Sequence, residues 1–543
     1  MFVRTKTFRR KDGSKRRYVY LVENKRINGK TKQITRANLG RLEDIQTQLP
    51  SIIKSLVKIT DTMQVLNLGR ELKPEWTREY GLKLIFEKLW EDMGFGEIMR
   101  MFAKDTRYEF NLEQSLFTLV LNRLMDPHSK LGVHDWVNEV YGLEQQELHQ
   151  WYRSLDFLVK YKENIEKQIF HQMRNLFNAD LDLVLFDTTS IVYWGKGEKS
   201  NELLNYGFSK QKRFDLKQVI VGVLMTKEGV PIGHEVYPGN TNDITAFKMM
   251  LESVKRKYAL RRVVFVCDRG MVSRENLEIL EAEKYEYIVG VRMRKMKKEI
   301  QDEFLDKADM QKVKEKDNLY AKEITREGKR YFICYNPERA VIDKERRDAL
   351  LLKLEEHLKT KGFKSLMLKK EYSKFLQVEA EKPEIDKTKV KRDALFDGKY
   401  ILASNIPEHK LSHKQAILYY KDLWQIEAGF RQLKNELELG PMYHWTETRI
   451  RGHIFICFLA LCLRIVFSKK LKMLHKHTSV DKVLNDVNKL KVVKITLKDI
   501  EYIMRTEFEG DTNLAFKALN LKPPNRVIYT NSDSVEIVVQ RFL

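Results

Sequence analysis

The segment from Asp182 to Met293 constrains the fold more than any other part of the chain, because strand-like and helix-like apolar patterns follow one another in a definite order. These patterns predict three strands, a helix, a strand, a second helix and a final strand. Three consecutive strands can pair as an antiparallel meander, and strands joined through helices can pair in parallel. We therefore expect an α/β domain built on a mixed five-stranded sheet with flanking helices.

The same segment carries two acidic residues directly after apolar strands. Asp187 follows LDLVLF, and Asp268 follows VVFVC. Taken alone, each is typical of a turn, since Asp187 precedes two threonines and Asp268 precedes Arg-Gly. The order of strands and helices, however, matches the ribonuclease H-like topology better than a uniformly doubly wound sheet, and that topology places these two strands side by side. We therefore expect two carboxylates at adjacent strand ends.

A third acidic residue lies within a predicted long helix, which begins after Ser412 as N-cap and ends at Gly440. Residues seven apart in a helix lie on nearly the same face, so Tyr420, Glu427 and Lys434 share one face. Carboxylates from two strands and a helix can hold two divalent cations against a phosphodiester. The three acidic residues together indicate phosphoryl transfer on nucleic acid.

This helix also allows a simpler interpretation. Arg431 lies four residues after Glu427, a spacing at which a solvated ion pair forms on a helix surface. Leu423, Ile426 and Phe430 give the helix an apolar face that can pack on a core. The sequence pattern of the helix leaves both interpretations open.

The charge of the chain indicates a polyanionic partner. The 543 residues contain 99 Lys and Arg against 76 Asp and Glu, a formal net charge of +23. Residues 1–36 hold 13 Lys or Arg against two acidic residues, and the pair Asn28-Gly29 is a strong signal for a hairpin turn. We expect residues 1–44 to form a basic β-hairpin segment that contacts DNA, although a merely solvated basic face fits the pattern as well.

Changes of pattern divide the rest of the chain. Apolar residues at helical spacing predict a helical domain over residues 45–178, suited to DNA binding or dimer contacts. The predicted core covers residues 179–293 and resumes over residues 399–470. Between them, a charged helix, a hairpin and a second charged helix predict an inserted subdomain over residues 294–398. Residues 471–543 remain as a C-terminal helical tail.

Cysteine usage and apolar runs indicate the compartment. The four cysteines are scattered and none has the spacing of a zinc site, which indicates buried thiols in a reducing compartment. The amino-terminal sequence has no apolar segment typical of a secretory signal. The longest apolar run, Ile454–Leu463, is too short to span a bilayer. We expect a cytoplasmic protein with no membrane partner.

These motifs, in this order, resemble the DDE transposases of bacterial insertion sequences. The resemblance is to the insertion sequence 4 type, which carries a Tyr-x2-Arg-x3-Glu-x6-Lys signature, and within it to the 1634-like branch. It covers nearly the whole chain, through NGK in the basic hairpin, DTT, PGNTND, CDRG, the helix of Glu427 and RGHIFICFLALCL after it. Each piece is common, whereas their order and spacing are specific.

The resemblance implies that Asp187, Asp268 and Glu427 are catalytic ligands of two metal ions, either Mg²⁺ or Mn²⁺. Ligation by oxygen alone suits both ions, so the residues do not choose between them. Asn240 and Asp243 in PGNTND are expected to cap the following helix, with a role beside the metal ligands as the alternative.

The same resemblance implies that Tyr420 and Lys434 contact DNA at the transposon end. The signature Arg is missing, because Leu423 stands in its place and cannot donate a hydrogen bond to phosphate. Arg431, one helical turn beyond the acidic residue, is a hypothetical substitute for that charge, and Lys421 is another.

The implied reaction is metal-dependent cleavage at the transposon ends, followed by attack of the new 3′ hydroxyl on target DNA. Excision is expected to be cut-and-paste through a hairpin, with the inserted subdomain holding the DNA end. Trp424 either stacks on an everted base there or faces the core as an ordinary aromatic. Expected partners are double-stranded DNA with terminal inverted repeats, target DNA and a second copy in a homodimer. The expected place is the nucleoid of a bacterial or archaeal cytoplasm, and a catalytically impaired or domesticated DNA-binding protein is the alternative.

Overall fold

The computed structural model describes most of the chain and divides it into two units. The described residues are 1–10, 13–27, 30–49, 51–52, 55, 72–177, 183–195, 201–208, 213–257, 264–268, 270, 273–313, 318–360, 369–379, 382–497 and 500–531. One unit comprises Met1–Trp76, Val493–Met504 and Val527–Leu543, and the other comprises Thr77–Val492 and Arg505–Arg526. Each unit is described by itself below.

The first unit contains a three-stranded antiparallel sheet at the amino terminus. Its elements are β1 (Phe2–Arg9), β2 (Lys15–Ile27), β3 (Lys30–Arg41) and the short helix α1 (Leu42–Gln46). The predicted hairpin forms between β2 and β3, whose ladder closes at Ile27 and Lys30, and its turn pair Asn28-Gly29 lies outside the described residues. The sheet has one strand more than the hairpin, because residues 2–9 pair along β2.

A four-stranded sheet in the order β18-β17-β16-β4 joins distant parts of the sequence. Its strands are β4 (Leu72–Glu79), β16 (Lys491–Leu497), β17 (Ile500–Arg505) and β18 (Val527–Thr530). Lys494 forms ion pairs with Glu75 at 3.0 Å and with Glu501 at 2.7 Å. The expectation of a purely helical tail over residues 471–543 is therefore wrong, since these polar strands pair through a ladder that helical periodicity does not indicate.

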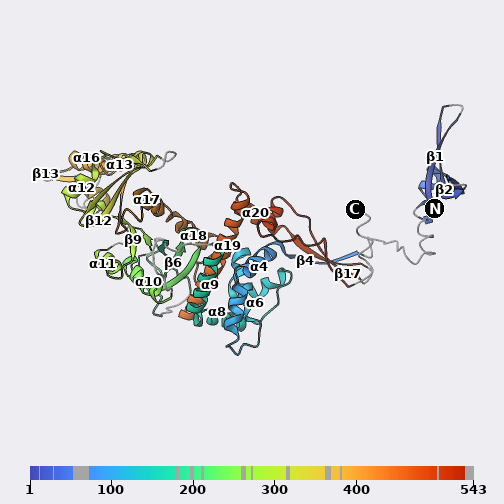
Figure 1. The fold of residues 1–543 in the computed structure, drawn as a ribbon, viewed down its shortest axis with the longest axis horizontal. Helices are drawn as coiled ribbons and strands as arrows, with labels where there is room; N and C mark the ends of the chain where they lie inside the picture. Colours follow the sequence, from blue (N-terminus) through green and yellow to red (C-terminus); the bar gives the residue numbers. More distant parts are fainter. Residues whose placement is uncertain are drawn as a thin grey trace. The chain divides into compact units, whose positions relative to one another are not determined.

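Helices form the part of the second unit that precedes the large sheet in sequence. They are α4 (Gly81–Asp92), α5 (Phe95–Ala103), α6 (Leu112–Met125), α7 (Lys130–Trp136), η1 (Val137–Glu139), α8 (Leu148–Lys160) and α9 (Lys162–Phe177). Three further helices from the other end of the chain pack with them, namely α19 (Glu447–Leu474), α20 (Val480–Asn488) and α21 (Thr512–Ala518). Figure 1 shows α19 beside α4, α8 and α9.

The long helix α19 forms the centre of this helical part. By length and composition it could cross a membrane, but 89% of its most apolar window is buried inside the fold. It packs against α4, α6 and α8. Gly452 allows the close approach of α8, because a Cβ there would lie 2.7 Å from Leu155 Cβ. The apolar run in the sequence is therefore explained by burial in a protein core.

The large sheet contains nine strands in the order β10-β11-β12-β15-β9-β8-β5-β6-β7. Its first part in sequence consists of β5 (Leu183–Val192), β6 (Gln218–Thr226), β7 (Pro231–Pro238), α10 (Asp243–Lys257), β8 (Val264–Cys267), α11 (Arg274–Ala282) and β9 (Glu286–Val291). This order of elements matches the predicted one. Strands β5, β6 and β7 pair antiparallel as the predicted meander, whereas β8 pairs parallel with both β5 and β9.

The expectation of a five-stranded sheet is wrong, because strands from residues 311–404 extend it. They are β10 (Gln311–Lys312), β11 (Tyr320–Arg326), β12 (Lys329–Tyr335) and β15 (Lys399–Ser404). β15 pairs with β9, and β12 pairs with β15 through apolar partners such as Phe332 and Leu402. The edge of β9 is thus covered by strands that are distant in sequence, which a local pattern cannot reveal.

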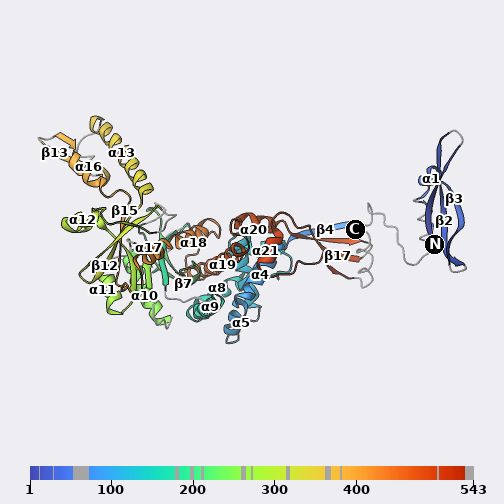
Figure 2. The ribbon, with the colours of Figure 1, turned by 45° about the horizontal axis from the view of Figure 1, so that its top comes forward.

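The remaining elements of residues 293–394 lie beside these added strands. They are η2 (Met293–Lys295), α12 (Lys298–Leu305), α13 (Pro337–Thr360), α15 (Lys370–Ser373), β13 (Leu376–Glu379), β14 (Lys382–Ile385) and α16 (Lys387–Ala394). Figure 2 shows α13, β13 and α16 grouped together. Leu354 of α13 and Phe375 and Leu376 near β13 share a small core of their own.

Helices cover both faces of the large sheet, as Figure 1 shows. α10 and α11 pack on one face, where Phe186 and Phe265 belong to one hydrophobic cluster with Phe247 of α10. α17 (His413–Lys421) and α18 (Trp424–Asn435) lie on the other face, where Leu185 and Val266 share a cluster with residues of α18 and α19. Side chains alternate between the faces along each strand. The identity of a strand residue's neighbours therefore tells which face it occupies.

Buried charges join the helical part to the sheet. Glu166 of α9 is fully buried, and it accepts hydrogen bonds from Lys257 of α10 at 2.7 Å and from the backbone N–H of His234 at 2.9 Å. Burial raises the pKa of Glu166, but Lys162 and Lys257 outweigh it and hold the pKa well below the usual value. The paired charges therefore fix α9 against β7 and α10, since a buried carboxylate without partners would be costly.

Candidate functional site

Asp187 and Asp268 lie level with each other on adjacent parallel strands. The last paired residues of β5 and β8 are Leu185 and Val266, so the two carboxylates stand two residues further along each chain. Adjacent strands run about 4.8 Å apart. Asp268 follows the last residue of β8, as expected, but Asp187 does not end its strand. β5 continues to Val192 because residues 187–192 pair with β6.

The two carboxylates, which we call the strand pair, occupy the same face of the sheet. Side chains two residues apart along a strand point to the same face of the sheet. Asp187 lies two residues after Leu185, and Asp268 lies two residues after Val266. Both apolar residues belong to the cluster on the side of α18 and α19. The strand pair therefore lies on the face that α17 and α18 cover.

Cys267 lies close enough to both carboxylates of the strand pair for their charges to affect its thiol. Its thiol is buried in the cluster on the side of α10 and α11, and burial, followed by the negative charges of Asp268 and Asp187, raises its pKa. The carboxylate of Asp187 is oriented by its neighbour, since Oδ1 accepts the backbone N–H of Thr188 at 2.7 Å. Two carboxylates thus act on one small volume at the edge of a buried sheet.

Asp243 is a third carboxylate near the strand pair, and sequence reasoning assigned it mainly to capping. The N-cap of α10 is instead Asn242, whose Oδ1 accepts the N–H of Thr245 at 2.8 Å, so the expected caps Asn240 and Asp243 are wrong. Asp243 Oδ1 accepts the hydroxyl of Thr188 at 2.6 Å. The signal for this contact was present in the motif, because Asn-Asp before a helix offers one side chain to the cap and leaves the other available.

Gly270 leaves space between two of these carboxylates. A Cβ on this residue would lie 3.5 Å from Asp243 Oδ2 and 3.9 Å from Asp268 Oδ2. Since glycine has no Cβ, the backbone at this point can lie close to both carboxylates. Asp243 therefore lies near the strand pair, and a role for it beside the metal ligands stays a prediction.

The predicted long helix forms, but as two helices with a tight junction. Ser412 caps α17 with a capping box to Gln415, as expected. At the junction, backbone bonds run from Leu423 to Tyr420, from Gln425 to Asp422 and from Ile426 to Leu423, which is the spacing of a 3₁₀ turn. α18 then ends at Asn435 rather than at Gly440.

Tyr420 connects this helix pair to the strand pair. Its hydroxyl donates to Asp268 Oδ1 at 3.1 Å. Its ring stacks on Tyr400 of β15, with centroids 6.3 Å apart and planes 23° apart. Tyr420 therefore orients a carboxylate of the strand pair. Its contact with DNA stays a prediction.

Glu427 projects from the exposed side of α18. Ile426, Phe430 and Leu433 bury the opposite side of the helix. Gly429 allows the close packing, because a Cβ there would lie 2.5 Å from Met225 Cε of β6. The predicted alternative of an ion pair between Glu427 and Arg431 is not formed among the described residues.

The structure brings together only part of the predicted triplet. Within the ranges that it describes, no three Asp, Glu, His or Cys side chains are close enough to hold a metal ion as a group. Asp187 and Asp268 lie together, while Glu427 lies on the helix that covers the same face. All three groups are carboxylates, which fit a hard divalent cation.

The other predicted site residues lie on or near α18. Trp424 is 61% exposed, so the alternative of a core-facing aromatic is wrong. Leu423 packs against the edge of the core, and Arg431 is exposed. Lys434 lines a cavity of about 350 Å³ together with the exposed aromatics Trp194 and Tyr443.

Two family descriptions match the chain. Residues 178–463 match the "Transposase DDE domain", and residues 3–73 match the "IS1634 family transposase, N-terminal domain". The first match spans more than half of the chain. The chain belongs to the DDE transposases. It is therefore a metal-dependent, DNA-cleaving transposase of the 1634 type, and the alternative of a DNA-binding protein without catalysis is not favoured.

Solved structures of other transposases are only distantly similar to this transposase. The piggyBac transposase synaptic complex with hairpin DNA has a TM-score of 0.36 and 11% identity, over 75% of this chain and 78% of that chain. The Mos1 transposase paired-end complex with left transposon end has a TM-score of 0.15 and 15% identity, over 45% of this chain and 66% of that chain. None of the curated proteins compared with the chain matches it.

Proposed function

We propose that the transposase cuts transposon ends with a metal site formed by Asp187, Asp268 and Glu427 in a ribonuclease H-like core. The observation that carries this proposal is the strand pair, whose two carboxylates share one register level and one sheet face. The helix of Glu427 packs on that same face. The strand pair and the position of α18 on the same sheet face support the proposal, within the part of the chain that matches the family.

The ligands suit two divalent ions, Mg²⁺ or Mn²⁺, because all three are hard oxygen donors. Bound there, the ions supply an activated water and stabilisation of the leaving oxygen. The protein holds Asp187 through the N–H of Thr188 and Asp268 through the hydroxyl of Tyr420. Glu427, which is exposed on α18, is the proposed third ligand.

We assign DNA contacts to residues on and near α18. The exposed ring of Trp424 is available to stack on an unpaired base. Lys434 and Arg431 supply positive charge. Arg431 replaces the charge of the signature Arg, whose position is occupied by Leu423. Tyr420 contacts the DNA strand while it orients Asp268.

The proposed reaction is cut-and-paste transposition. One strand is cut at each transposon end, and the 3′ hydroxyl produced attacks target DNA, with a hairpin as the excision intermediate. The working complex is a homodimer that holds two terminal inverted repeats together. It acts in the nucleoid of the cytoplasm. The basic residues of the amino-terminal sheet support DNA contact by residues 1–44.

We keep the predicted division of the remaining chain as part of this proposal. Residues 45–178, which hold the strand β4 as well as the expected helices, serve dimer contacts or DNA binding, and residues 179–293 with 399–470 form the catalytic core. Residues 294–398 hold the DNA end. Support for this last role comes from β11 and β12, which pair into the same sheet as the strand pair.

Neutralising each carboxylate tests the proposal. Asp187→Asn, Asp268→Asn and Glu427→Gln should each lower end cleavage by about 10³-fold or more, since several kcal/mol of charge stabilisation are lost. Binding of end DNA should remain at the wild-type level. Gel assays with labelled transposon ends measure both quantities.

Glu355→Gln, on the exposed surface of α13, is the matched control and should cleave normally. Normal cleavage by any of the three site variants would remove that residue from the site. A covalent adduct between protein and DNA would contradict the metal mechanism altogether, because direct displacement by water needs no covalent nucleophile.

A further inference from the structure

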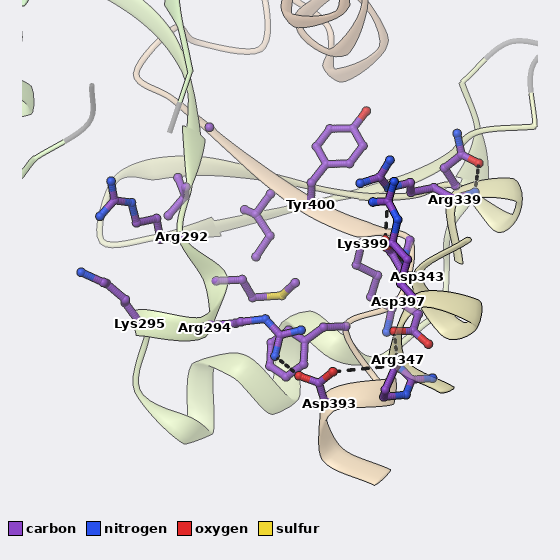
Figure 3. Close-up of a pocket in the computed structure, with 18 of the residues that line it drawn as sticks. Arg292, Arg294, Lys295, Arg339, Asp343, Arg347, Asp393, Asp397, Lys399 and Tyr400 are labelled. Carbon is purple, nitrogen blue, oxygen red and sulfur yellow. Dashed lines mark hydrogen bonds and ion pairs between the residues drawn. The ribbon is translucent and has the colours of Figure 1, made fainter. Parts of the chain in front are cut away.

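A basic cavity lies between the sheet and the elements of residues 293–394. It has a volume of about 930 Å³, and its lining includes residues of η2, α13, the end of α16 and β15. Eight Lys or Arg line it against three Asp. Figure 3 shows the cationic side chains arranged around it. The cavity is therefore an electropositive concavity rather than an apolar one.

Two carboxylates hold part of this charge in place. Arg347 pairs with Asp397 at 2.5 Å, and Arg294 pairs with Asp393 at 2.5 Å while lying 4.4 Å from the ring centroid of Phe396. Figure 3 shows these pairs on one side of the cavity. These arginines are oriented before any ligand arrives, which lowers the entropy cost of binding.

Other cations of the lining have no carboxylate partner. Among the residues that the structure describes, Arg292, Lys295 and Arg346 form no ion pair and are exposed. Figure 3 shows Arg292 and Lys295 at the side of the cavity opposite Asp397. The cavity thus presents positive charge that the protein itself does not neutralise.

The cavity reaches the candidate metal site through Tyr420. This residue belongs to the cavity lining, and its hydroxyl donates to Asp268 Oδ1 at 3.1 Å. Tyr400, on which its ring stacks, also lines the cavity. A strand cut at the strand pair would therefore meet these two aromatic rings and then the cations.

We propose that this cavity binds the phosphates of a single DNA strand that passes Tyr420 as the strand leaves the metal site. This proposal rests on the proposed function. The volume is at the upper end of the range of about 300–1,000 Å³ typical of small-ligand pockets, which suits a few nucleotides. Aromatic rings beside a cationic channel are the usual means of binding single strands.

Salt dependence of binding tests the proposal on the full chain. Binding of a single-stranded oligonucleotide is measured without divalent ions, so the result does not depend on the metal site. Arg292→Ala/Lys295→Ala should reduce the slope of log K against log salt by about 1.4, since each phosphate contact contributes about 0.7. Lys472→Ala/Lys476→Ala, exposed at and just after the end of α19 and outside the cavity, should leave the slope unchanged.

A second variant and a competitor complete the experiment. Arg346→Ala should reduce the slope by about 0.7, and melting temperatures verify that each variant folds. Unchanged slopes in both cavity variants would overturn the proposal. Inorganic triphosphate is a second probe, which distinguishes a site for a small anion from a site for a strand. If the variants weaken the binding of triphosphate but leave the slope for the oligonucleotide unchanged, the cavity binds a small anion. That result would also overturn the proposal. Failure of the metal site would appear only in the cleavage assays above.

Discussion

The strand pair and Glu427 are held by different kinds of structure. Asp187 and Asp268 are fixed by the register of two parallel strands whose neighbouring residues are buried. Glu427 is exposed on α18, whose opposite side packs on the sheet after a tight junction at Leu423. A change of strand register would move every side chain to the other face, so the strand pair is rigidly specified. A helix carboxylate can change its position through side-chain torsions alone.

This difference teaches how the site is built. We infer that the strand pair exists before metal and DNA bind, and that Glu427 joins it on binding. The inference agrees with the absence, among the described residues, of a group of three side chains gathered around one point.

Metal affinity should separate the two parts of the site. Asp187→Asn should lower Mn²⁺ affinity by on the order of 100-fold or more, because losing a ligand costs at least as much as the 10–100-fold loss typical for a ligand's hydrogen-bond partner. Glu427→Gln should lower it by less than about 10-fold, although cleavage is lost in both variants. Calorimetric titration of the DNA-free protein measures this. Equal losses of affinity would mean that Glu427 is already part of the site.

The hydrogen bond from Thr188 to Asp243 should matter less, but measurably. Thr188→Val removes a 2.6 Å contact beside the strand pair, and we expect cleavage to fall by about 10-fold, at the low end of such losses. Thr118→Val is the matched control, since its buried hydroxyl has no hydrogen-bond partner among the described residues. Cleavage rates of both variants at saturating metal decide the matter. A normal rate for Thr188→Val would remove Asp243 from the account.

The smallest effect is expected at the missing signature position. Leu423→Arg should leave cleavage roughly unchanged, because Arg431 already supplies the charge under this proposal. Leu423 packs at the core edge, so the variant should lose about 1 kcal/mol of stability, a typical cost for such a substitution. Single-turnover cleavage and thermal unfolding measure the two effects. A large gain in cleavage would show that the charge is not replaced.

Local sequence patterns predicted the order of elements and one end of the site. The apolar runs gave the meander, the central strand and the helices between them, and Ser412 marked the start of α17. Asp268 follows its strand as expected, because Val264–Cys267 is a short, fully buried run. These features depend on residues close in sequence.

Features that depend on distant pairing were missed. Asp187 was placed at a strand end, yet β5 continues because Thr188 to Val192 find partners in β6. The sheet has nine strands because β15 and the hairpin of β11 and β12 reach the edge of β9. The junction at Leu423 was also missed, since its residues are compatible with a continuous helix. No local periodicity encodes these contacts, which arise only when the chain is folded.

Anomalous diffraction from Mn²⁺ in crystals of the wild-type protein with cleaved end DNA tests the central claim most directly. The account predicts a Mn²⁺ peak about 2.1 Å from a carboxylate oxygen of Asp187 and of Asp268, with Glu427 drawn onto the metal site. A peak at other residues, with the DNA end in place, would contradict the assignment of this site.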